Sequence, residues 1–459
     1  MPNAVAYIAL LLWPAVTLAL FASMRPAQAL IWSLLGGYLL LPVKTGFDFP
    51  VIPALDKTSI PSAAALIGAL IFAGPRAVRL PREWWLMTLL VLYVVSPMLT
   101  VLTNRDSLVF GNLMLPGLKP YDAFAAAAYS GIHLIPFLLG YNMLRTARSQ
   151  DYLLRALVAA MLFYSLLMLI EVRLSPQLHT WIYGFFPHNF DQQMRSGGFR
   201  PVVFLGHGLL IAILTSMTIV AAAYLALRRA QIFGVSAWFW LAYLMCIMVL
   251  CRSLGALILS VTALLAAISI RRGGVRLICA LVAITVLAYP MMRGADLMPV
   301  QVLADQFAAA SPERASSLQT RIDNEDSLLD RADQRPLFGW GGYGRNRVFD
   351  EYTGKDMSIT DGTWIIIIGT SGWAGYIATF GLLCLPLVGT WWRGMHVSAA
   401  GAALSLILAV NLLDLIPNSS LTPLTWLLAG TLAAIPQRTR RAKHSKRSRT
   451  AAELAYSAQ

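Results

Sequence analysis

The sequence predicts an all-α fold, a polytopic membrane helix bundle of about 12–13 spans with one large extracytoplasmic loop. Hydrophobic residues make up 58% of the chain and charged residues only 13%, whereas soluble domains carry about 25% charged residues. Apolar runs long enough to cross a bilayer, roughly 17–25 residues each, recur along the whole sequence. Arginines and lysines gather in alternate loops between these runs, as in the cytoplasmic loops of membrane proteins.

About thirteen apolar segments account for the expected spans. In order along the chain they are 4–23, 27–42, 59–74, 84–101, 121–143, 152–170, 201–227, 237–251, 254–270, 275–292, 362–385, 398–416 and 420–435. The first segment does not have the pattern of a cleaved signal peptide, because no basic region precedes it and Arg25 follows it.

Basic residues mark the loops that we expect on the cytoplasmic side. They are Arg76, Arg79, Arg82, Arg145, Arg148, Arg155, Arg228, Arg229, Arg271, Arg272 and Arg276, with a basic tail from Arg438 to Arg449. This pattern places the C-terminus inside and, with an odd number of spans, the N-terminus outside. We interpret the tail as a topology signal that contacts anionic membrane lipids. The alternative, a nucleic-acid patch, stays open, although we expect no nucleic acid among the partners.

On this topology the chain divides into six parts. They are an N-terminal transmembrane bundle (1–170), an outer loop with arginines (171–200), central spans (201–292), a large extracytoplasmic loop (293–361), C-terminal spans (362–435) and a basic cytoplasmic tail (436–459). The large loop holds eight basic and twelve acidic residues, so its arginines stand in a net acidic segment. Within this loop, 313–333 has the spacing of a helix that Pro336 ends.

The four cysteines, Cys246, Cys251, Cys279 and Cys384, lie inside apolar segments without a CxxC pair or a Cys/His ligand set. We expect them to be packing residues, with neither disulfides nor a structural metal. The sequence contains no Walker, Rossmann, HExxH or GxSxG motif, and its scattered carboxylates do not form a clear divalent-metal pattern. We therefore expect no cofactor.

Two arginines and a histidine mark the entry to the segment 201–227. Pro201 suits the first turn of a helix. Arg200 and His207 are seven residues apart and would share one face of that helix, with His207 about 10 Å deeper. Guanidinium groups make bidentate contacts to phosphate, so Arg195 and Arg200 are candidate pyrophosphate ligands. The alternatives are interfacial anchors for the arginines and, for His207, a histidine bonded to a neighbouring helix.

Two further arginines are candidates with clear alternatives. Arg252 lies between two apolar runs with almost no loop, so it either snorkels to the outer interface or points into a polar cavity. Arg321 and Glu325 are neighbours on one face if 313–333 is helical. The alternative for Arg321 is a solvated helix face that ion pairs hold.

The segment that follows this helix contains two more candidates. Arg335 opens the run RPLFGWGGYG, whose glycines form either an anion-binding nest or a tight turn. The spacing is not that of a P-loop. Asp361 comes directly before the apolar segment 362–385, where partial desolvation of a carboxylate raises its pKa toward that of a general base. Asp is also a favoured helix N-cap, and the two roles are compatible.

These motifs resemble those of the bacterial O-antigen ligase and polymerase superfamily, integral-membrane glycosyltransferases that use undecaprenyl-diphosphate-linked glycans. The resemblance rests on RSGGFRPVVFLGHG (195–208), LCRSLGALILS (250–260), RADQRPLFGWGGYG (331–344) and TDGTWIIIIGTSGWAGYIATFGLL (360–383), which keep the family's order over about the second half of the chain. It implies a fold similar to other multi-span lipid-linked-sugar glycosyltransferases. It also implies a metal-independent active site on the periplasmic side of the inner membrane.

The resemblance implies roles for the candidates. Two outer-loop arginines of the family hold the lipid pyrophosphate, and by position Arg195 or Arg200 looks like the first and Arg321 like the second. Family ligases place a histidine just before the span that follows the large loop, where this chain has Thr360-Asp361-Gly362. This departure favours a polymerase. Asp361 and His207 are then both candidates for the catalytic base, and Arg252 and Arg335 are further candidate pyrophosphate ligands.

We therefore expect a surface polysaccharide polymerase that joins undecaprenyl-diphosphate-linked repeat units of an O-antigen or exopolysaccharide. Its expected partners are the lipid-linked glycan, membrane lipids, and a chain-length regulator and flippase of the same pathway. Three alternatives stay open: an O-antigen ligase that transfers glycan to lipid A-core or protein, a lipid-linked oligosaccharide flippase or other transporter, and a non-catalytic scaffold. The large outer loop argues against the transporter.

Overall fold

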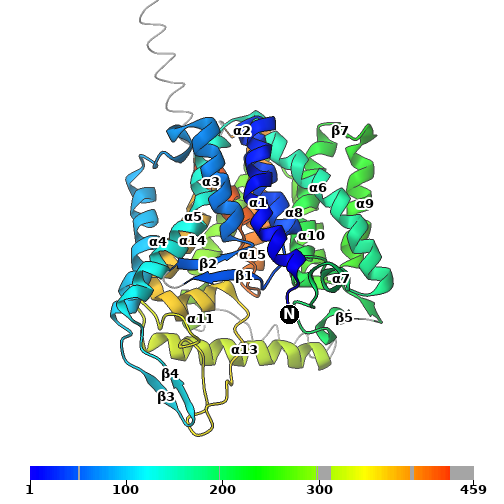
Figure 1. Cartoon of the computed structure of the whole chain (residues 1–459). Coiled ribbons are helices and arrows are strands. Elements are labelled where there is room, and N and C mark those ends of the chain that lie inside the picture. Colours follow the sequence, from blue (N-terminus) through cyan, green and yellow to red (C-terminus); the bar gives the residue numbers. More distant parts are fainter. Residues whose placement is uncertain (50–51, 196, 296, 298–311, 393–396, 435–459) are drawn as a thin grey trace, which may run out of the picture.

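The structure, a computed structural model, is mostly helical (Figure 1). It describes residues 1–49, 52–195, 197–295, 297, 312–392 and 397–434, and the elements below belong to these residues. The predicted basic tail, 436–459, lies outside them.

Each predicted apolar segment corresponds to a helix. These helices are α1 (Ala4–Ser23), α2 (Pro26–Leu40), α3 (Ser59–Ala73), α4 (Trp84–Leu102), α5 (Pro120–Met143), α6 (Ala147–Leu174), α8 (Gly208–Leu227), α9 (Ala237–Leu250), α10 (Leu254–Ser269), α11 (Arg272–Gly294), α14 (Thr363–Trp392), α15 (Ala399–Asp414) and α16 (Pro423–Ala433). Among the described residues, 7 helices are long and apolar enough to cross a membrane: α1, α4, α5, α6, α8, α11 and α14. The prediction of an all-α multi-pass bundle is confirmed to this extent, and the count of 12–13 spans stays a prediction.

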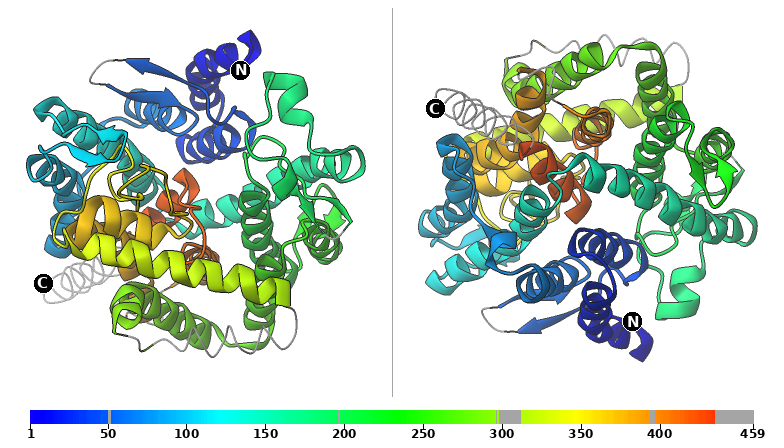
Figure 2. Two further views of the ribbon diagram at one scale, coloured as in Figure 1. Left: turned by 90° about the horizontal axis from the view of Figure 1, so that it is seen from below. Right: turned by 90° about the horizontal axis from the view of Figure 1, so that it is seen from above.

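The helices form one bundle in which α8 is the most deeply buried of these 7 (Figure 2). Helix α8 packs against α6, α9, α10 and α15, while α14 packs against α4, α11 and α16. Helix α5 joins the first half of the chain to the last through its contact with α16. Large apolar side chains on outer faces, such as Leu11, Phe163 and Leu265, are exposed. Such a surface fits contact with lipid hydrocarbon.

The connections at one end of the bundle carry most of the remaining structure. They contain the antiparallel hairpins β1–β2 (Gly46–Phe49, Ile52–Asp56), β3–β4 (Leu108–Phe110, Leu113–Leu115) and β5–β6 (Met194–Arg195, Gly198–Phe199), and the helices α7 (Leu178–Tyr183) and α13 (Pro312–Asp333). This end, which we call the loop end, also holds the N-terminus and is the lower end in Figure 1. The hairpin β7–β8 (Gln231–Ile232, Val235–Ser236) lies at the opposite end.

Helix α13 confirms the prediction of a helix over 313–333. Its residues Ile322 and Leu328 are buried against the bundle. Arg293, at the end of α11, is buried beneath it and pairs with Asp326 and with Glu325, where Nε and Oε2 are 3.8 Å apart. Helix α13 thus lies across the loop end and is tied to α11 (Figure 2).

Helix α8 begins at Gly208 and not at Pro201. The prediction that Arg200 and His207 share one face of this helix is therefore wrong. Both lie in the loop before it, and His207 is the N-cap, whose Nδ1 accepts a hydrogen bond from the Leu209 N–H at 3.0 Å. The seven-residue spacing of Arg200 and His207 therefore does not give their relative depth in the membrane.

Side chains of α6 bind the backbone of this loop, so α8 begins later in the sequence than predicted. The buried carboxylate of Glu171 accepts hydrogen bonds from the N–H groups of Val202 and Val203, both at 2.7 Å. The Tyr164 hydroxyl accepts one from the Phe204 N–H at 3.0 Å. Val203 also has a φ of 45°, which lies outside the right-handed helical region. A helix that started earlier would have to give up these contacts.

Helix α14 is broken at Gly372, which has φ 62° and ψ −167°. The glycine-rich loop after α13 docks on the break. The Trp340 N–H donates to the Gly369 carbonyl and the Trp373 N–H donates to the Pro336 carbonyl, both at 2.8 Å. The loop thus pairs backbone groups that the break leaves without partners in the helix. Glycine suits the loop because the two backbones approach closely.

We expect Gly339→Ala to destabilise the protein by about 2 kcal/mol or more. Gly339 has φ 66°, and an added Cβ would lie 2.6 Å from the backbone nitrogens of Ser371 and Gly372. The matched control is Gly342→Ala, because a Cβ there meets open space and its φ is not positive. Thermal unfolding of the purified protein in detergent would show a lower Tm for Gly339→Ala alone. Equal Tm values for the two variants would contradict this role for the loop.

Candidate functional site

Arg200 is buried in the loop before α8, with 2% of its side chain exposed. Its backbone N–H donates to the Gln193 carbonyl at 2.9 Å, and its stem lies so close to Gly208 that a Cβ there would be 2.5 Å from the Arg200 Cδ. Within the described chain, no side-chain hydrogen bond or ion pair of Arg200 is found, and its Nε is buried without a partner. A buried guanidinium without an acceptor is costly, so this position suits an anionic ligand.

Burial lowers the pKa of Arg200 to about 10, and the neighbouring charge of Arg195 adds to this effect. Arg200 therefore remains positive at neutral pH. Burial also lowers the pKa of His207 to about 4, with His188 and the two arginines adding to the effect. His207 is thus neutral, and because its Nδ1 accepts a hydrogen bond, its proton is assigned to Nε2. It is suited to donate a hydrogen bond to a ligand.

Arg252 joins this group from the turn between α9 and α10. Its Nη1 donates to the Arg195 carbonyl at 2.6 Å. Its guanidinium covers Gly198, where a Cβ would lie 2.2 Å from Nη2. The structure thus brings Arg195, Arg200, Arg252 and His207 together beside the β5–β6 hairpin, and we call these four residues the arginine cluster.

A second pair of candidates also comes together at the loop end. Arg321 of α13 faces Asp361, with 3.6 Å between Nη2 and Oδ2, and both side chains are about half-exposed. Helix α14 begins at Thr363, so Gly362 and not Asp361 holds the N-cap position. The capping alternative for Asp361 is therefore wrong. Its carboxylate remains available to a ligand beside Arg321.

The turn after α15 touches both groups. Asp414 is close enough to Arg200 for its charge to oppose the lowering of the Arg200 pKa. The next residue, Leu415, accepts a hydrogen bond from the Thr363 N–H at 3.0 Å, directly after the segment that carries Asp361. The arginine cluster and the Arg321–Asp361 pair therefore flank the same turn.

Glu325 lies beside this pair, and sequence reasoning missed its burial. Burial raises the pKa of Glu325 to about 7, while Arg293 and Arg321 oppose the shift. The available signal was helical spacing, since Glu325 lies three residues after Ile322 and four before Leu329 on the apolar face of α13. A carboxylate in that position has to be partly buried once α13 packs on the bundle.

The raised pKa of Glu325 predicts a pH-dependent stability. The folded protein holds this proton more tightly than the unfolded chain, whose ordinary value is 4.5, so the free energy of unfolding falls as the pH rises from about 4.5 to about 7. Glu325→Gln should remove this component and flatten the fall of Tm between pH 5 and 8. The control is Glu351→Gln at an exposed position. The same pH profile in wild type and both variants would contradict the assignment.

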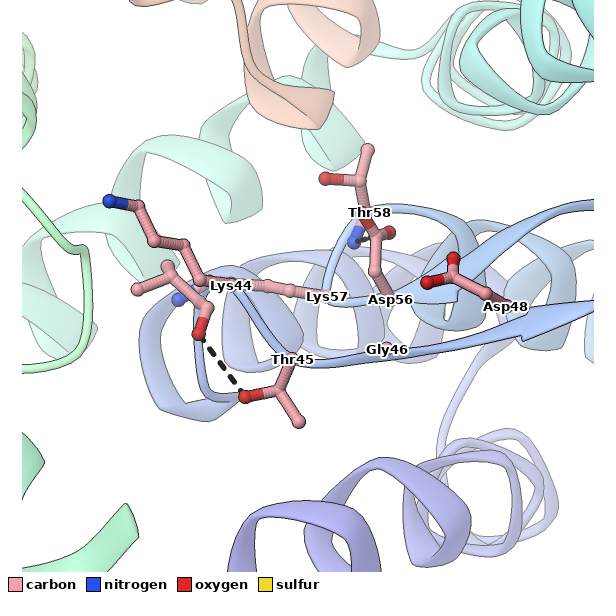
Figure 3. Close-up of a pocket in the computed structure, with 8 residues that line it drawn as sticks. Lys44, Thr45, Gly46, Asp48, Asp56, Lys57 and Thr58 are labelled. Atoms are coloured by element: carbon pink, nitrogen blue, oxygen red, sulfur yellow. Dashed lines mark hydrogen bonds between the residues drawn. The ribbon is translucent and has the colours of Figure 1, made fainter. Parts of the chain in front are cut away.

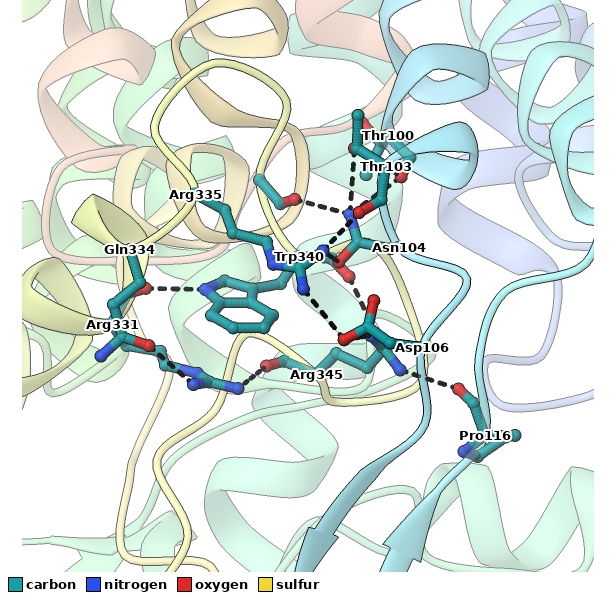
Figure 4. A network of polar contacts seen from close by, with 11 residues as sticks. Thr100, Thr103, Asn104, Asp106, Pro116, Arg331, Gln334, Arg335, Trp340 and Arg345 are labelled. Atoms are coloured by element: carbon teal, nitrogen blue, oxygen red, sulfur yellow. Dashed lines mark hydrogen bonds and ion pairs between the residues drawn. The ribbon is translucent and has the colours of Figure 1, made fainter.

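Arg335 lies apart from the arginine cluster, in a network at the end of α4 (Figure 4). Its Nη1 donates to the Thr103 carbonyl and, at 2.9 Å, to Asn104 Oδ1, and its Nη2 is 2.9 Å from Asp106 Oδ2. These contacts use three of the five N–H donors of the guanidinium and hold it at the end of α4. Asp106 has a lowered pKa because of its hydrogen bonds and the charge of Arg335, which outweigh its partial burial.

Two further arginines complete the network. Arg331 and Arg335 both lie over the ring of Trp340, with 3.4 and 4.5 Å from guanidinium carbon to ring centroid. Arg345 is fully buried and donates to the Pro116 carbonyl at 2.9 Å. The network thus fastens the glycine-rich loop to α4 and to the β3–β4 hairpin (Figure 4). No motif in the sequence signalled the burial of Arg345.

Sequence reasoning also missed two residues that position the arginine cluster. One is Glu171, which follows the predicted span 152–170 directly, and an ionisable residue at that depth was the available signal. The other is Lys57, whose Nζ donates to the carbonyls of Leu41 and Phe204, each at 2.7 Å. Nothing in the sequence around Lys57 predicts this contact.

In the part of the chain that the structure describes, no group of three or more His, Cys, Asp or Glu side chains is placed to hold a metal ion. The four cysteines are free, and three of them, Cys251, Cys279 and Cys384, are buried.

Comparison with protein-family models gives no match, and comparison with curated proteins gives none either. The family resemblance stays a prediction from the motifs in 195–208, 250–260, 331–344 and 360–383. The structure places two of these motifs, 195–208 and 250–260, in the arginine cluster. The other two are joined by the docking of the glycine-rich loop on α14.

Proposed function

We propose that this chain is a surface polysaccharide polymerase, a glycosyltransferase of the bacterial inner membrane that joins undecaprenyl-diphosphate-linked repeat units on the periplasmic side. The observation that carries the proposal is Arg200, a buried guanidinium without an acceptor in the described chain, beside Arg195 and a neutral His207. These groups lie at the loop end of a multi-pass apolar bundle. A diphosphate on a membrane-bound lipid is complementary to the positive charge of these arginines, and its lipid would place it at this end of the bundle.

In the proposed reaction, a hydroxyl of the acceptor sugar attacks C1 of the donor glycan. The bond between C1 and the diphosphate oxygen breaks, and undecaprenyl diphosphate leaves with the electron pair. Arg195 and Arg200 stabilise the negative charge that builds up on the diphosphate, and Nε2 of His207 donates a hydrogen bond to it. Arg252 keeps the β5–β6 hairpin in place through the Arg195 carbonyl.

Asp361 is the favoured base for the acceptor hydroxyl. His207 suits this role less well, because its Nδ1 is occupied and its Nε2 carries the proton. The 3.6 Å between Arg321 and Asp361 is longer than a hydrogen bond, so Arg321 keeps donors for a phosphate oxygen while it orients the carboxylate. Arg335 has no direct role in this proposal, because its contacts with Asn104 and Asp106 hold it in a separate network at the end of α4.

A ligase would use the same donor chemistry with a different acceptor, lipid A-core or protein. A transporter is less well supported. Broken spans are typical of transporters, where half-helix ends contact the substrate. Here the backbone of the glycine-rich loop fills the break in α14. Expected partners in the pathway are a flippase that delivers the donor and a chain-length regulator.

Deletion of the gene tests the function and separates polymerase from ligase. Loss of a polymerase should remove long glycan chains while single repeat units still reach their acceptor. Loss of a ligase should leave long chains on undecaprenyl diphosphate and none on the acceptor. Gel ladders of surface glycan and mass spectrometry of extracted lipid-linked glycans distinguish the two results. A normal ladder together with normal lipid-linked intermediates would overturn the proposal.

A further inference from the structure

A cleft of about 420 Å³ opens at the loop end, between the start of β1 and the start of α3 (Figure 3). Its volume falls within the roughly 300–1,000 Å³ that is typical of small-molecule sites. It is lined by Val43, Lys44, Thr45, Gly46, Asp48, Asp56, Lys57 and Thr58. None of these residues belongs to the arginine cluster or to the Arg321–Asp361 pair.

The lining offers hydrogen-bond donors and acceptors beside apolar surface. Lys44 and Asp48 are exposed, and within the described chain neither side chain makes a hydrogen bond. One carboxylate oxygen of Asp56, Oδ1, accepts from the N–H groups of Thr58 and Ser59 at 2.8 and 2.9 Å. The other oxygen has no such partner among the described residues. Ammonium, carboxylate and hydroxyl groups in one small cleft suit a ligand with several hydroxyl groups.

The cleft shares a wall with the arginine cluster. Lys57 donates to the carbonyl of Phe204, in the loop that carries Arg200 and His207. Val43 lies against Gly206, where an added Cβ would be 2.9 Å from Val43 Cγ2. The two sites are therefore parts of one surface at the loop end.

A histidine pair gives a second connection. Partial burial lowers the pKa of His188, and the nearby charge of Lys44 adds to this effect. The rings of His188 and His207 are in contact, with 4.6 Å between their centroids. A ligand in the cleft would therefore lie near the anion-binding side of the arginine cluster.

We propose that this cleft is a glycan subsite that binds the terminal sugar of the acceptor chain beside the donor diphosphate. The inference rests on the proposed function, because a transferase must hold its two substrates side by side before they react. The sugar hydroxyls donate to Asp48 and Asp56 and accept from Lys44 and Thr58. Lys57 fixes the distance between the subsite and the loop that carries Arg200.

The test uses full-length protein in lipid nanodiscs and oligosaccharides released from the surface glycan of the wild-type strain. Saturation-transfer NMR should detect binding to the wild type and a fall in affinity of about tenfold or more in the double variant Lys44→Ala/Asp48→Ala. Neither side chain makes a hydrogen bond within the described chain, so the fold should be kept. The matched control is Glu351→Ala/Lys355→Ala, at exposed positions of the same end.

Two results separate this inference from the function on which it rests. Unchanged oligosaccharide binding in the Lys44→Ala/Asp48→Ala variant overturns the subsite, and so does the absence of binding to the wild type. The donor side is measured independently, as the rise in Tm that undecaprenyl diphosphate gives the wild type and not Arg200→Met. If that rise is absent from the wild type, the proposed function fails whatever the oligosaccharides do.

Discussion

Replacing Arg200 by methionine should abolish long surface glycan chains without loss of protein stability. Methionine keeps an unbranched stem of similar length over Gly208 and removes a buried charge that has no acceptor in the described chain. The charge has Asp414 as a nearby counter-charge but no hydrogen-bonded acceptor in the described chain, so its removal is expected to change Tm little. The diphosphate loses its most deeply placed cation, so transfer should fall by about two orders of magnitude or more.

The measurement pairs surface glycan ladders with Tm values of the purified variants. Arg173→Met is the matched control, because Arg173 is an exposed arginine in the last turn of α6. Arg200→Lys should recover only part of the product, since a single ammonium cannot make the two parallel contacts of a guanidinium. If Arg200→Met forms normal chains, Arg200 is not a donor ligand. If it loses chains only because Tm falls, the residue has a structural role.

Replacing Asp361 by asparagine should lower the rate of transfer by about 10²–10⁴-fold, the range typical for loss of a general base. The substitution keeps the shape of the side chain and removes its basicity. Stability should change little, because Arg321 and Asp361 are both about half-exposed and such ion pairs contribute roughly 0–1 kcal/mol. The rise in Tm with undecaprenyl diphosphate should persist, which separates this variant from Arg200→Met.

Asp330→Asn is the matched control for this substitution, because Asp330 is an exposed aspartate on α13, the helix that carries Arg321. Transfer rates in nanodiscs, with the lipid-linked repeat unit as both donor and acceptor, give the comparison. A rate for Asp361→Asn equal to that of the control would remove Asp361 as the base. His207→Gln would then be the next variant to measure.

The sequence predicted correctly those elements that are determined by residues close together in the chain. Apolar runs gave the helices of the bundle, and the spacing of Ile322 and Leu328 gave α13 with its end at Asp333. Both patterns arise because residues close together in the sequence face the same apolar or polar surroundings. The convergence of Arg195, Arg200 and Arg252 was not visible from the sequence without the resemblance.

The errors have non-local causes. The start of α8 depends on Glu171 and Tyr164, which lie on α6 and take the N–H groups that a helix at Pro201 would need. Arg335 was a candidate ligand because of its glycine-rich surroundings, yet it forms an ion pair with Asp106, more than two hundred residues earlier in the chain. Periodicity carries no information about such distant partners.

The break in α14 has a consequence for the order of biosynthesis. Translation produces the loop that contains Pro336 before Gly372 leaves the ribosome, so the partner of the break already exists when the broken span emerges. A fragment that started at Thr363 would instead present unpaired amide and carbonyl groups to hydrocarbon. Such a fragment should insert poorly unless the residues from Pro336 to Gly341 are supplied, either on the same chain or as a co-expressed piece.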